Sequence, residues 1–234
     1  MSTFVSLHGK PVCIADAAGK ACYKMLTFTK ILIRRMNAKQ IAERLKGFTV
    51  GIAGAGGLGS NCAVALVRCG LKNLVVADFD VVQASNLNRQ YYFMDQLGMK
   101  KIAALEQNLN RIATGLQLEM VDKKLEPADI IALFKNCDVI VEAFDDKAQK
   151  QMLIETHLEN FPQKPLVIGT GMAGWGANNA LQTQNYDFIY VCGDQQSEIA
   201  EDLPPLGPRV GIVANMQANQ VLEILLGKMN KHDN

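Results

Sequence analysis

From residue 48 to residue 169 the chain alternates short apolar runs with longer stretches of mixed polarity. The apolar runs have the length and the flanking residues of buried strands. We expect strands over residues 48–53, 73–78, 116–121, 138–143 and 165–169, and helices over residues 60–69, 98–113, 127–134 and up to 157. Strands that alternate with helices favour a parallel sheet covered on both faces. The pattern therefore predicts a doubly wound, mostly parallel α/β fold.

Both ends of the chain depart from this alternation. Residues 181–184 and 188–191 predict an antiparallel pair of strands, residues 193–208 a polar loop, and residues 210–226 a closing helix capped by Gly227. Residues 1–46 read as an N-terminal appendage, with a hairpin around Gly9-Lys10 and a basic helix from about residue 23 to residue 46. We therefore divide the chain into this appendage and one main domain, residues 47–230.

Composition and charge exclude several classes of protein. The chain has 234 residues, of which 49% are hydrophobic and 20% charged, so it affords a sizeable core. Its net charge of +1 gives no general attraction to nucleic acid or to an anionic membrane. The start lacks the layout of a signal peptide, and glycines interrupt the most apolar stretch, residues 48–67. We expect a cytoplasmic protein that binds neither membrane nor nucleic acid.

The six cysteines give no sign of a metal site. No two of them are spaced as C-x-x-C, the arrangement that a structural Cys₄ zinc site requires. We therefore expect no zinc, and we expect most of the thiols to be buried and reduced.

A glycine-rich loop follows the first predicted strand. Gly54, Gly56 and Gly59 form G-x-G-x-x-G between a strand and a helix, with Gly57 inside the motif. Small residues let the backbone approach phosphates, which the N–H groups at the helix start then bind. Asp78 ends the next predicted strand, 22 residues after Gly56, where a carboxylate accepts hydrogen bonds from a ribose. This Rossmann-like context predicts a nucleotide and leaves NAD, FAD and ATP open.

The segment after Asp78 favours ATP over a nicotinamide. A polar loop with Asn86, Arg89 and Gln90 follows, where a hydride-transfer domain enters its next helix directly. Lys101 opens the following helix, and Asp145 ends the fourth predicted strand. An arginine fork and a lysine neutralise phosphates, and one carboxylate suits a Mg²⁺ ion that bridges them.

Each of these charged residues also has a simpler interpretation. Arg89 has the character of a solvated surface arginine, and Lys101 belongs to a Lys100-Lys101 pair of the kind that begins many exposed helices. Asp145, next to Asp146, also fits the cap of the following helix. The occurrence of all three residues at this spacing after a glycine loop favours their interpretation as catalytic residues.

With these motifs the sequence resembles the ThiF/MoeB/HesA adenylyltransferases, relatives of the ubiquitin-activating enzymes. The resemblance covers about residues 40–227 and rests on the strings Gly54-Ala-Gly-Gly-Leu-Gly-Ser60, Asp78-Phe-Asp80, Ser85-Asn-Leu-Asn-Arg-Gln90, Gly98-Met-Lys-Lys101, Asp145-Asp-Lys-Ala-Gln-Lys150 and Pro208-Arg-Val-Gly-Ile-Val213.

The resemblance assigns a role to each candidate residue. It implies that Asp78 binds the ribose, that Asn86, Arg89 and Gln90 contact phosphates, and that Asp145 holds Mg²⁺. It implies that Lys101 is the phosphate lysine, with Lys100 as its rival. It also implies an enzyme, commonly a homodimer, that uses ATP to adenylate the C-terminal glycine of a ubiquitin-like sulfur-carrier protein.

Two departures point to one branch of that family. The best-known members carry two C-x-x-C pairs, whereas this chain has none and is short. Both features, with the string Val191-Cys-Gly-Asp194, look like the compact ThiF branch of thiamine biosynthesis, whose carrier is ThiS. The alternatives are a MoaD-type carrier for molybdopterin synthesis, a tRNA-modifying dehydratase, a nucleotide-binding scaffold without chemistry, and a nicotinamide-dependent oxidoreductase.

Two further hypotheses concern residues outside the phosphate site. In some family members a cysteine after the central sheet becomes linked to the carrier, and Cys192 has that position if the loop after it leaves it exposed. Its neighbour Asp194 argues against a reactive thiol, because a thiolate needs positive charge nearby. The resemblance also implies that Arg34 or Arg35 reaches the ATP of a neighbouring subunit, although both fit a solvated basic helix face.

Overall fold

The chain divides into two compact units, Met1–Met36 and Asn37–Asn234. Our computed structural model describes residues 14–15, 21–22 and 36–228. In the smaller unit, β1 (Ile14–Ala15) pairs antiparallel with β2 (Ala21–Cys22), and Ile14 lies opposite Cys22. The hairpin expected around Gly9-Lys10 and most of the helix expected from residue 23 lie outside the described residues.

The larger unit contains a seven-stranded sheet with the strand order β5-β4-β3-β6-β7-β9-β8. Its strands are β3 (Thr49–Ala53), β4 (Asn73–Ala77), β5 (Gln117–Val121), β6 (Val139–Glu142), β7 (Leu166–Gly169), β8 (Gln182–Tyr186) and β9 (Ile189–Gly193). All neighbouring strands are parallel except β8, which pairs antiparallel with β9. This confirms the predicted α/β sheet and its antiparallel C-terminal extension.

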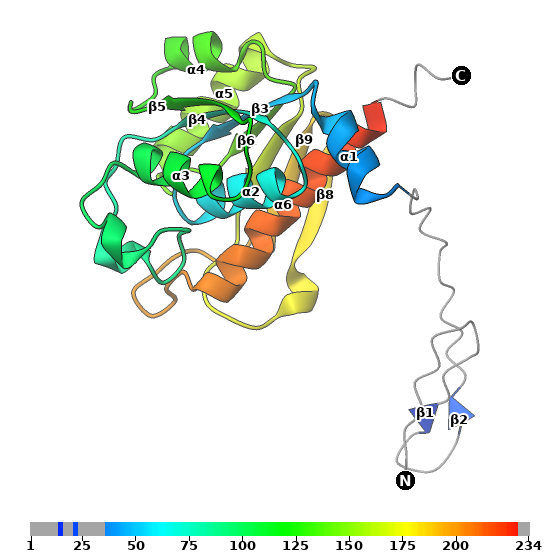
Figure 1. Ribbon diagram of the computed structural model, residues 1–234. Helices are drawn as coiled ribbons and strands as arrows, with labels where there is room; N and C mark the ends of the chain where they lie inside the picture. The colour runs from blue at the N-terminus through cyan, green and yellow to red at the C-terminus, as the bar shows by residue number, and fades with distance from the viewer. Residues whose placement is uncertain (1–13, 16–20, 23–35, 229–234) are drawn as a thin grey trace. The chain divides into compact units, whose positions relative to one another are not determined.

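Helices cover both faces of this sheet (Figure 1). One apolar core includes side chains of α2 (Gly57–Arg68), α3 (Lys101–Asn110) and α6 (Gly207–Lys228). A second core, under α4 (Pro127–Phe134) and α5 (Lys147–Asn160), lies on the other face. Short 3₁₀ turns, η1 (Ala84–Asn86), η2 (Met94–Gln96) and η3 (Asn178–Ala180), interrupt the connecting loops. None of the described helices combines the length and apolarity that crossing a bilayer requires.

Helix α1 (Ala38–Leu45) belongs to the larger unit, which corrects our boundary at residues 46 and 47. Asn37 caps it, since its side chain accepts the N–H of Gln40 at 2.9 Å. Leu45 is fully buried in the core that α6 shares. A second difference concerns Gly227, which lies inside α6 instead of capping it, because the helix continues to Lys228.

The strand order places a switch point between β3 and β6. From β3 the chain proceeds to β4 and β5 on one side, and then crosses to β6 and β7 on the other. At such a point the loops after two neighbouring parallel strands diverge, and open α/β sheets bind ligands in the crevice between them. Here those loops begin at Gly54, after β3, and at Ala143, after β6.

Candidate functional site

The glycine loop after β3 has no room for a side chain at Gly54 or at Gly59. A Cβ at position 54 would lie 2.7 Å from the carbonyl oxygen of Ala143, and one at position 59 would lie 1.8 Å from the carbonyl oxygen of Gly54. Gly54 also has a φ of +101°, a conformation that favours glycine. Gly56 is the N-cap of α2 and supplies no side-chain hydrogen bond to the first turn. The N–H groups of that turn therefore suit an anion.

Asp78 ties the end of β4 to the glycine loop. It is 9% exposed, one carboxylate oxygen accepts the N–H of Ala55 at 2.6 Å, and the other accepts the N–H of Asp80 at 2.8 Å. Burial raises the pKa of Asp78, while Lys101 and these two N–H donors act to lower it. The Tyr92 hydroxyl donates to the carbonyl of Ala55 at 2.7 Å, which fixes the loop further. Each carboxylate oxygen keeps a lone pair for a ribose hydroxyl.

Lys101 points toward this carboxylate cluster, whereas its neighbour Lys100 does not. The Lys101 side chain is 6% exposed, and its ammonium lies 2.7 Å from Asp80. Lys100 pairs instead with Asp122 on the surface, at 3.1 Å. An ammonium has three donors, so Lys101 keeps two beyond Asp80 for phosphate oxygens. Asp80 was not among our candidates, although its position two residues after Asp78 was a signal for it.

Arg89 lies against the glycine loop through its aliphatic stem. A Cβ at position 57 would be 3.7 Å from its Cγ. Its guanidinium donates to the carbonyl of Ser85 and to the side-chain oxygen of Asn88, both at 2.9 Å. The Asn61 amide donates to the carbonyls of Gly57 and Arg89, at 2.7 and 2.9 Å, and so joins the two loops. Because Ser85 and Asn88 both bind the same terminal nitrogen, the guanidinium keeps further N–H donors for a ligand.

Asn86 and Gln90 have different surroundings from each other. The Asn86 side chain accepts the N–H of Gln83 at 3.0 Å, so it stabilises the η1 turn. Gln90 is 8% exposed, and its amide nitrogen would lie 3.8 Å from a Cβ at Gly56. Its buried side-chain oxygen has no hydrogen-bond partner within the described part of the chain. A buried acceptor without a partner, beside a glycine loop, fits a ligand that donates to it.

Asp145 follows β6 on the other side of the glycine loop and is exposed. The cap of α5 is its neighbour Asp146, whose carboxylate accepts the N–H of Gln149 at 2.8 Å. Asp145 is therefore not required as a helix cap. A single exposed carboxylate suits Mg²⁺, which takes one or two carboxylates together with phosphate oxygens. The described residues contain no group of three or more metal-binding side chains that would hold an ion by themselves.

A buried ion pair supports the turn that carries Asp145. Glu142 is fully buried and pairs with Lys150, which also donates to the carbonyl of Gly169 at 3.0 Å. The Glu142 carboxylate accepts the N–H of Phe144 at 2.7 Å. We did not identify Glu142 or Lys150 from the sequence, because a glutamate at the end of an apolar strand carries no signal of its partner.

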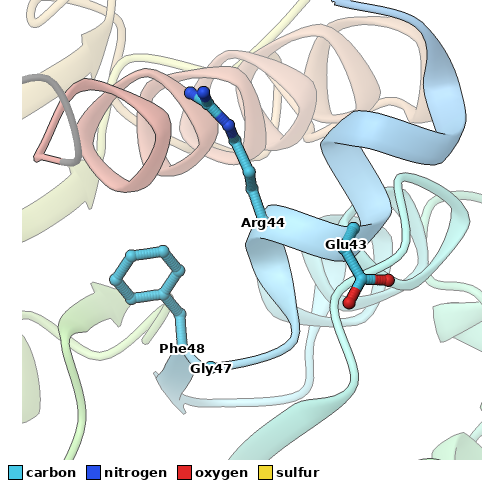
Figure 2. A pocket seen from close by; sticks show the side chains of 4 residues that line it. All are labelled: Glu43, Arg44, Gly47 and Phe48. Atoms are coloured by element: carbon cyan, nitrogen blue, oxygen red, sulfur yellow. The ribbon is translucent and has the colours of Figure 1, made fainter. Parts of the chain in front are cut away.

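Three segments thus meet at the glycine loop: residues 78–80 with Lys101, residues 85–90, and residues 143–145. Two shallow hollows elsewhere do not border it. One, of about 370 Å³, lies at the beginning of β3 and is lined by Glu43, Arg44, Gly47 and Phe48. Figure 2 shows Glu43 and Arg44 pointing away from each other there. The other lies at the outer strands β4 and β5, around Asn73 and Gln117.

Cys192 is buried, so the exposure that a reactive thiol after the sheet would need is not present. It lies inside β9, and its sulfur contacts the hydroxyl of Thr183 at 3.5 Å. Burial raises the pKa of the Cys192 thiol, so the nucleophilic thiolate is disfavoured. Arg34 and Arg35 lie outside the described residues.

Comparison with known proteins connects this site to one family. The ThiF family matches residues 29–234. The molybdopterin-synthase adenylyltransferase of Escherichia coli (strain K12) is 28% identical over 211 residues, 87% of this chain and 83% of that protein. Ubiquitin-like modifier-activating enzyme 5 of Drosophila ananassae is 32% identical over 129 residues, 55% of this chain. The chain spans only 32% of that longer relative.

A solved structure has the same fold. The E. coli tRNA N6-threonylcarbamoyladenosine dehydratase TcdA, in complex with AMP, superposes with a TM-score of 0.73. It is 18% identical to this chain, and the match covers 81% of this chain and 90% of that one.

Proposed function

Because the chain belongs to the ThiF family, we propose that it is an adenylyltransferase that uses ATP to activate a carrier protein. A carboxylate oxygen at the carrier's C-terminus attacks the α-phosphorus of ATP. A bond from that oxygen to phosphorus forms, the bond to the bridging oxygen of the β-phosphate breaks, and pyrophosphate leaves with the electron pair. The product is a carrier acyl-adenylate. The names of the E. coli relative and of the adenylyltransferase and sulfurtransferase MOCS3 of Dictyostelium discoideum support this reaction class.

The observation that carries the proposal is that residues 78–80 with Lys101, residues 85–90 and residues 143–145 meet at the glycine loop. Adenylation needs no covalent residue, because positioning and neutralisation of charge lower its barrier. Arg89 and Lys101 supply positive charge on two sides of the loop, and Asp78 has lone pairs for the ribose. Gln90 has a buried acceptor that no described residue hydrogen-bonds. Dehydrogenases use a similar loop, but a triphosphate would also use the donors of Lys101 that Asp80 does not bind.

We assign Mg²⁺ to Asp145. When bound, the ion would neutralise phosphate charge and orient the leaving pyrophosphate. The chain's own part is to hold that carboxylate at the end of β6, which the hydrogen bond from Phe144 to Glu142 does. Exposure of Asp145 suits an ion that arrives with the nucleotide and keeps several waters.

We propose a ubiquitin-like sulfur carrier of the ThiS type as the partner, in thiamine biosynthesis, and a homodimer as the working form. The absence of C-x-x-C pairs and the string Val191-Cys-Gly-Asp194 support this branch. The named role of the E. coli relative favours a MoaD-type carrier instead. The fold likeness to TcdA favours a tRNA substrate, although this chain has no basic excess to bind one.

Pyrophosphate exchange into ATP tests the proposal and separates the carriers. We expect labelled pyrophosphate to enter ATP only with Mg²⁺ and a carrier with intact terminal glycines. A ThiS-type carrier should support exchange better than a MoaD-type one, and tRNA should support none. Exchange that persists after deletion of the carrier's terminal glycines would contradict the substrate assignment.

Two neighbouring lysines provide a matched pair of variants. Lys101→Ala should lower exchange by about a hundredfold or more, because it removes a buried charge from the phosphate site. Lys100→Ala, which loses an exposed pair with Asp122 and one hydrogen bond to the carbonyl of Phe79, should retain the wild-type rate. Equal rates of pyrophosphate exchange for the two variants would show that Lys101 has no specific role in the reaction.

A further inference from the structure

A tyrosine to which the proposed reaction gives no role lies beside the glycine loop. Tyr92 is 5% exposed, and its hydroxyl donates to the carbonyl oxygen of Ala55 at 2.7 Å. The N–H of Ala55 donates to the carboxylate of Asp78 at 2.6 Å. Burial, and then the nearby carboxylates of Asp78 and Asp80, raise the pKa of Tyr92 above its ordinary value, so the hydroxyl remains a neutral donor. The backbone of Ala55 is therefore held at both of its polar groups.

The hydroxyl fixes the direction of the peptide unit that joins Ala55 to Gly56. This unit is trans, since none of the described peptide bonds is cis. In a trans peptide unit the C=O and N–H groups point in opposite directions. Because Tyr92 belongs to the core and holds the carbonyl of Ala55 toward itself, the N–H of Gly56 points away from that core.

The next carbonyl of the loop is held by the protein as well. The carbonyl oxygen of Gly56 accepts the N–H of Ser60 at 3.0 Å and the Ser60 hydroxyl at 2.6 Å. The same hydroxyl accepts the N–H of Tyr91 at 3.0 Å. Gly57 is the first residue of α2, so its N–H has no partner within the helix. With both carbonyls anchored, the N–H groups of Gly56 and Gly57 suit the same phosphate.

The glycine at position 56 makes such an anchor necessary. Its φ of −77° suits any residue, and a Cβ there would make only an ordinary contact, at 3.8 Å, with the amide nitrogen of Gln90. The space that this Cβ would fill is therefore open to a ligand. A glycine also lets the peptide unit before it rotate at little cost. After such a rotation the carbonyl of Ala55 would face the phosphate, and its partial negative charge would repel that anion.

We propose that Tyr92 is a positioning residue for the phosphates of the nucleotide. Its hydroxyl holds the carbonyl of Ala55 away from the triphosphate and so directs the N–H of Gly56 toward it. The inference rests on the proposed function, since it takes ATP as the ligand of the glycine loop. Tyr92 touches neither the base nor the ribose in this scheme. Its loss should therefore weaken the binding of a nucleotide with phosphates more than that of a nucleoside without them.

Two adjacent tyrosines provide a matched pair of variants. Tyr92→Phe removes one hydroxyl and keeps the ring. Tyr91→Phe is the control, because the Tyr91 hydroxyl accepts a hydrogen bond from Arg68 at the surface, at 3.3 Å. The contact of Tyr91 with Ser60 uses its backbone N–H and remains in the variant. Thermal melting shows whether each variant folds.

ATP and adenosine together separate the positioning of phosphates from general damage to the site, because adenosine has the same base and ribose and no phosphate. Calorimetry gives the Kd for ATP, and a titration followed by NMR gives the Kd for adenosine. We expect Tyr92→Phe to raise the Kd for ATP by about tenfold, the value of one hydrogen bond to a charged group, and to change the Kd for adenosine by less than about twofold. Tyr91→Phe should match the wild type for both ligands. A folded Tyr92→Phe with the wild-type Kd for ATP, or with equal losses for ATP and adenosine, would overturn the inference.

A measurement on the unaltered chain tests the same geometry without the tyrosine variants. In protein that contains ¹⁵N-labelled glycine, the amide signal of Gly56 is assigned by its loss in Gly56→Ala. We expect ATP to move this signal and adenosine to leave it in place. A Gly56 amide that does not respond to ATP, or that responds equally to both ligands, would also overturn the inference.

The proposed function and this inference fail in different ways. A wild-type chain that binds ATP but exchanges no pyrophosphate with any carrier refutes the adenylyltransferase, and the comparison of ATP with adenosine still decides the role of Tyr92. A wild-type chain that binds no ATP refutes both.

Discussion

Substitution of one glycine by alanine tests the geometry of the glycine loop most sharply. In Gly59→Ala the new Cβ would lie 1.8 Å from the carbonyl oxygen of Gly54, whereas real Cβ contacts essentially never fall below 3.0 Å. The backbone must therefore move by at least about 1.2 Å, the gap between these two distances. Because the obstacle is backbone and not the end of a flexible side chain, the loop itself has to shift.

Both stability and nucleotide binding should respond to that shift. Overpacking of this kind costs about 1–3 kcal/mol. In a chain of this size it lowers the melting temperature by about 2–12 °C. A displacement of about 1 Å at a site that positions phosphates should reduce the rate of exchange by about a hundredfold.

Differential scanning fluorimetry, calorimetry with ATP and pyrophosphate exchange measure these effects. Gly211→Ala is the control, because the position is inside α6 and, beyond its own helical turn, no atom of the described residues lies within 4 Å of a Cβ there. It should leave exchange unchanged and raise stability by about 0.5–1 kcal/mol, the helical preference of alanine over glycine. A Gly59→Ala variant with wild-type melting and wild-type affinity for ATP would refute the close approach of Gly54 and Gly59.

Three more predictions address residues away from the glycine loop. Lys150→Met leaves the buried carboxylate of Glu142 without its partner and should cost about 3 kcal/mol or more in urea unfolding, whereas Lys147→Met, which loses an exposed pair, should cost little. Burial lowers the pKa of His157 below its ordinary 6.5. The free energy of unfolding should therefore be highest above the ordinary pKa and fall as the pH drops through it, because the unfolded chain then binds the proton more readily. His157→Gln should flatten a plot of melting temperature against pH between about pH 7.5 and 5.5. Cys192→Ala should retain pyrophosphate exchange, and a trapped thioester between Cys192 and a carrier would contradict its burial.

Local patterns allowed the sheet and the glycine loop to be predicted from the sequence. Apolar runs of strand length mark β3 to β7, and the G-x-G-x-x-G string fixes the turn after β3, because these features depend on neighbouring residues alone. The placement of Asp78 follows from the same strand and loop. The polar loop and the helix start that follow Asp78 selected Arg89 and Lys101, and the family resemblance then assigned their roles.

The features that the sequence did not reveal depend on contacts between distant segments. Lys101 meets Asp80 across 21 residues, and Arg209 meets Asp194 across 15. No local period indicates which carboxylate a lysine or arginine will reach. The burial of Cys192 could not be predicted for the same reason, because the exposure of a residue at the end of a strand depends on which distant segments pack over it. We assigned helix α1 to the appendage because no local pattern in the sequence indicates that it packs with α6.

Intact-mass measurement of the carrier is the most direct test of the central claim, that the charged groups around the glycine loop transfer AMP to a terminal carboxylate. The chain is incubated with ATP, Mg²⁺ and a ThiS-type carrier, and the carrier's mass is then recorded. We predict an adduct of one AMP at the carrier's C-terminal glycine, absent with Lys101→Ala and present with Lys100→Ala. A carrier that stays unmodified while TcdA-type tRNA substrates are consumed, or an adduct that Lys101→Ala still forms at the wild-type rate, would contradict the account.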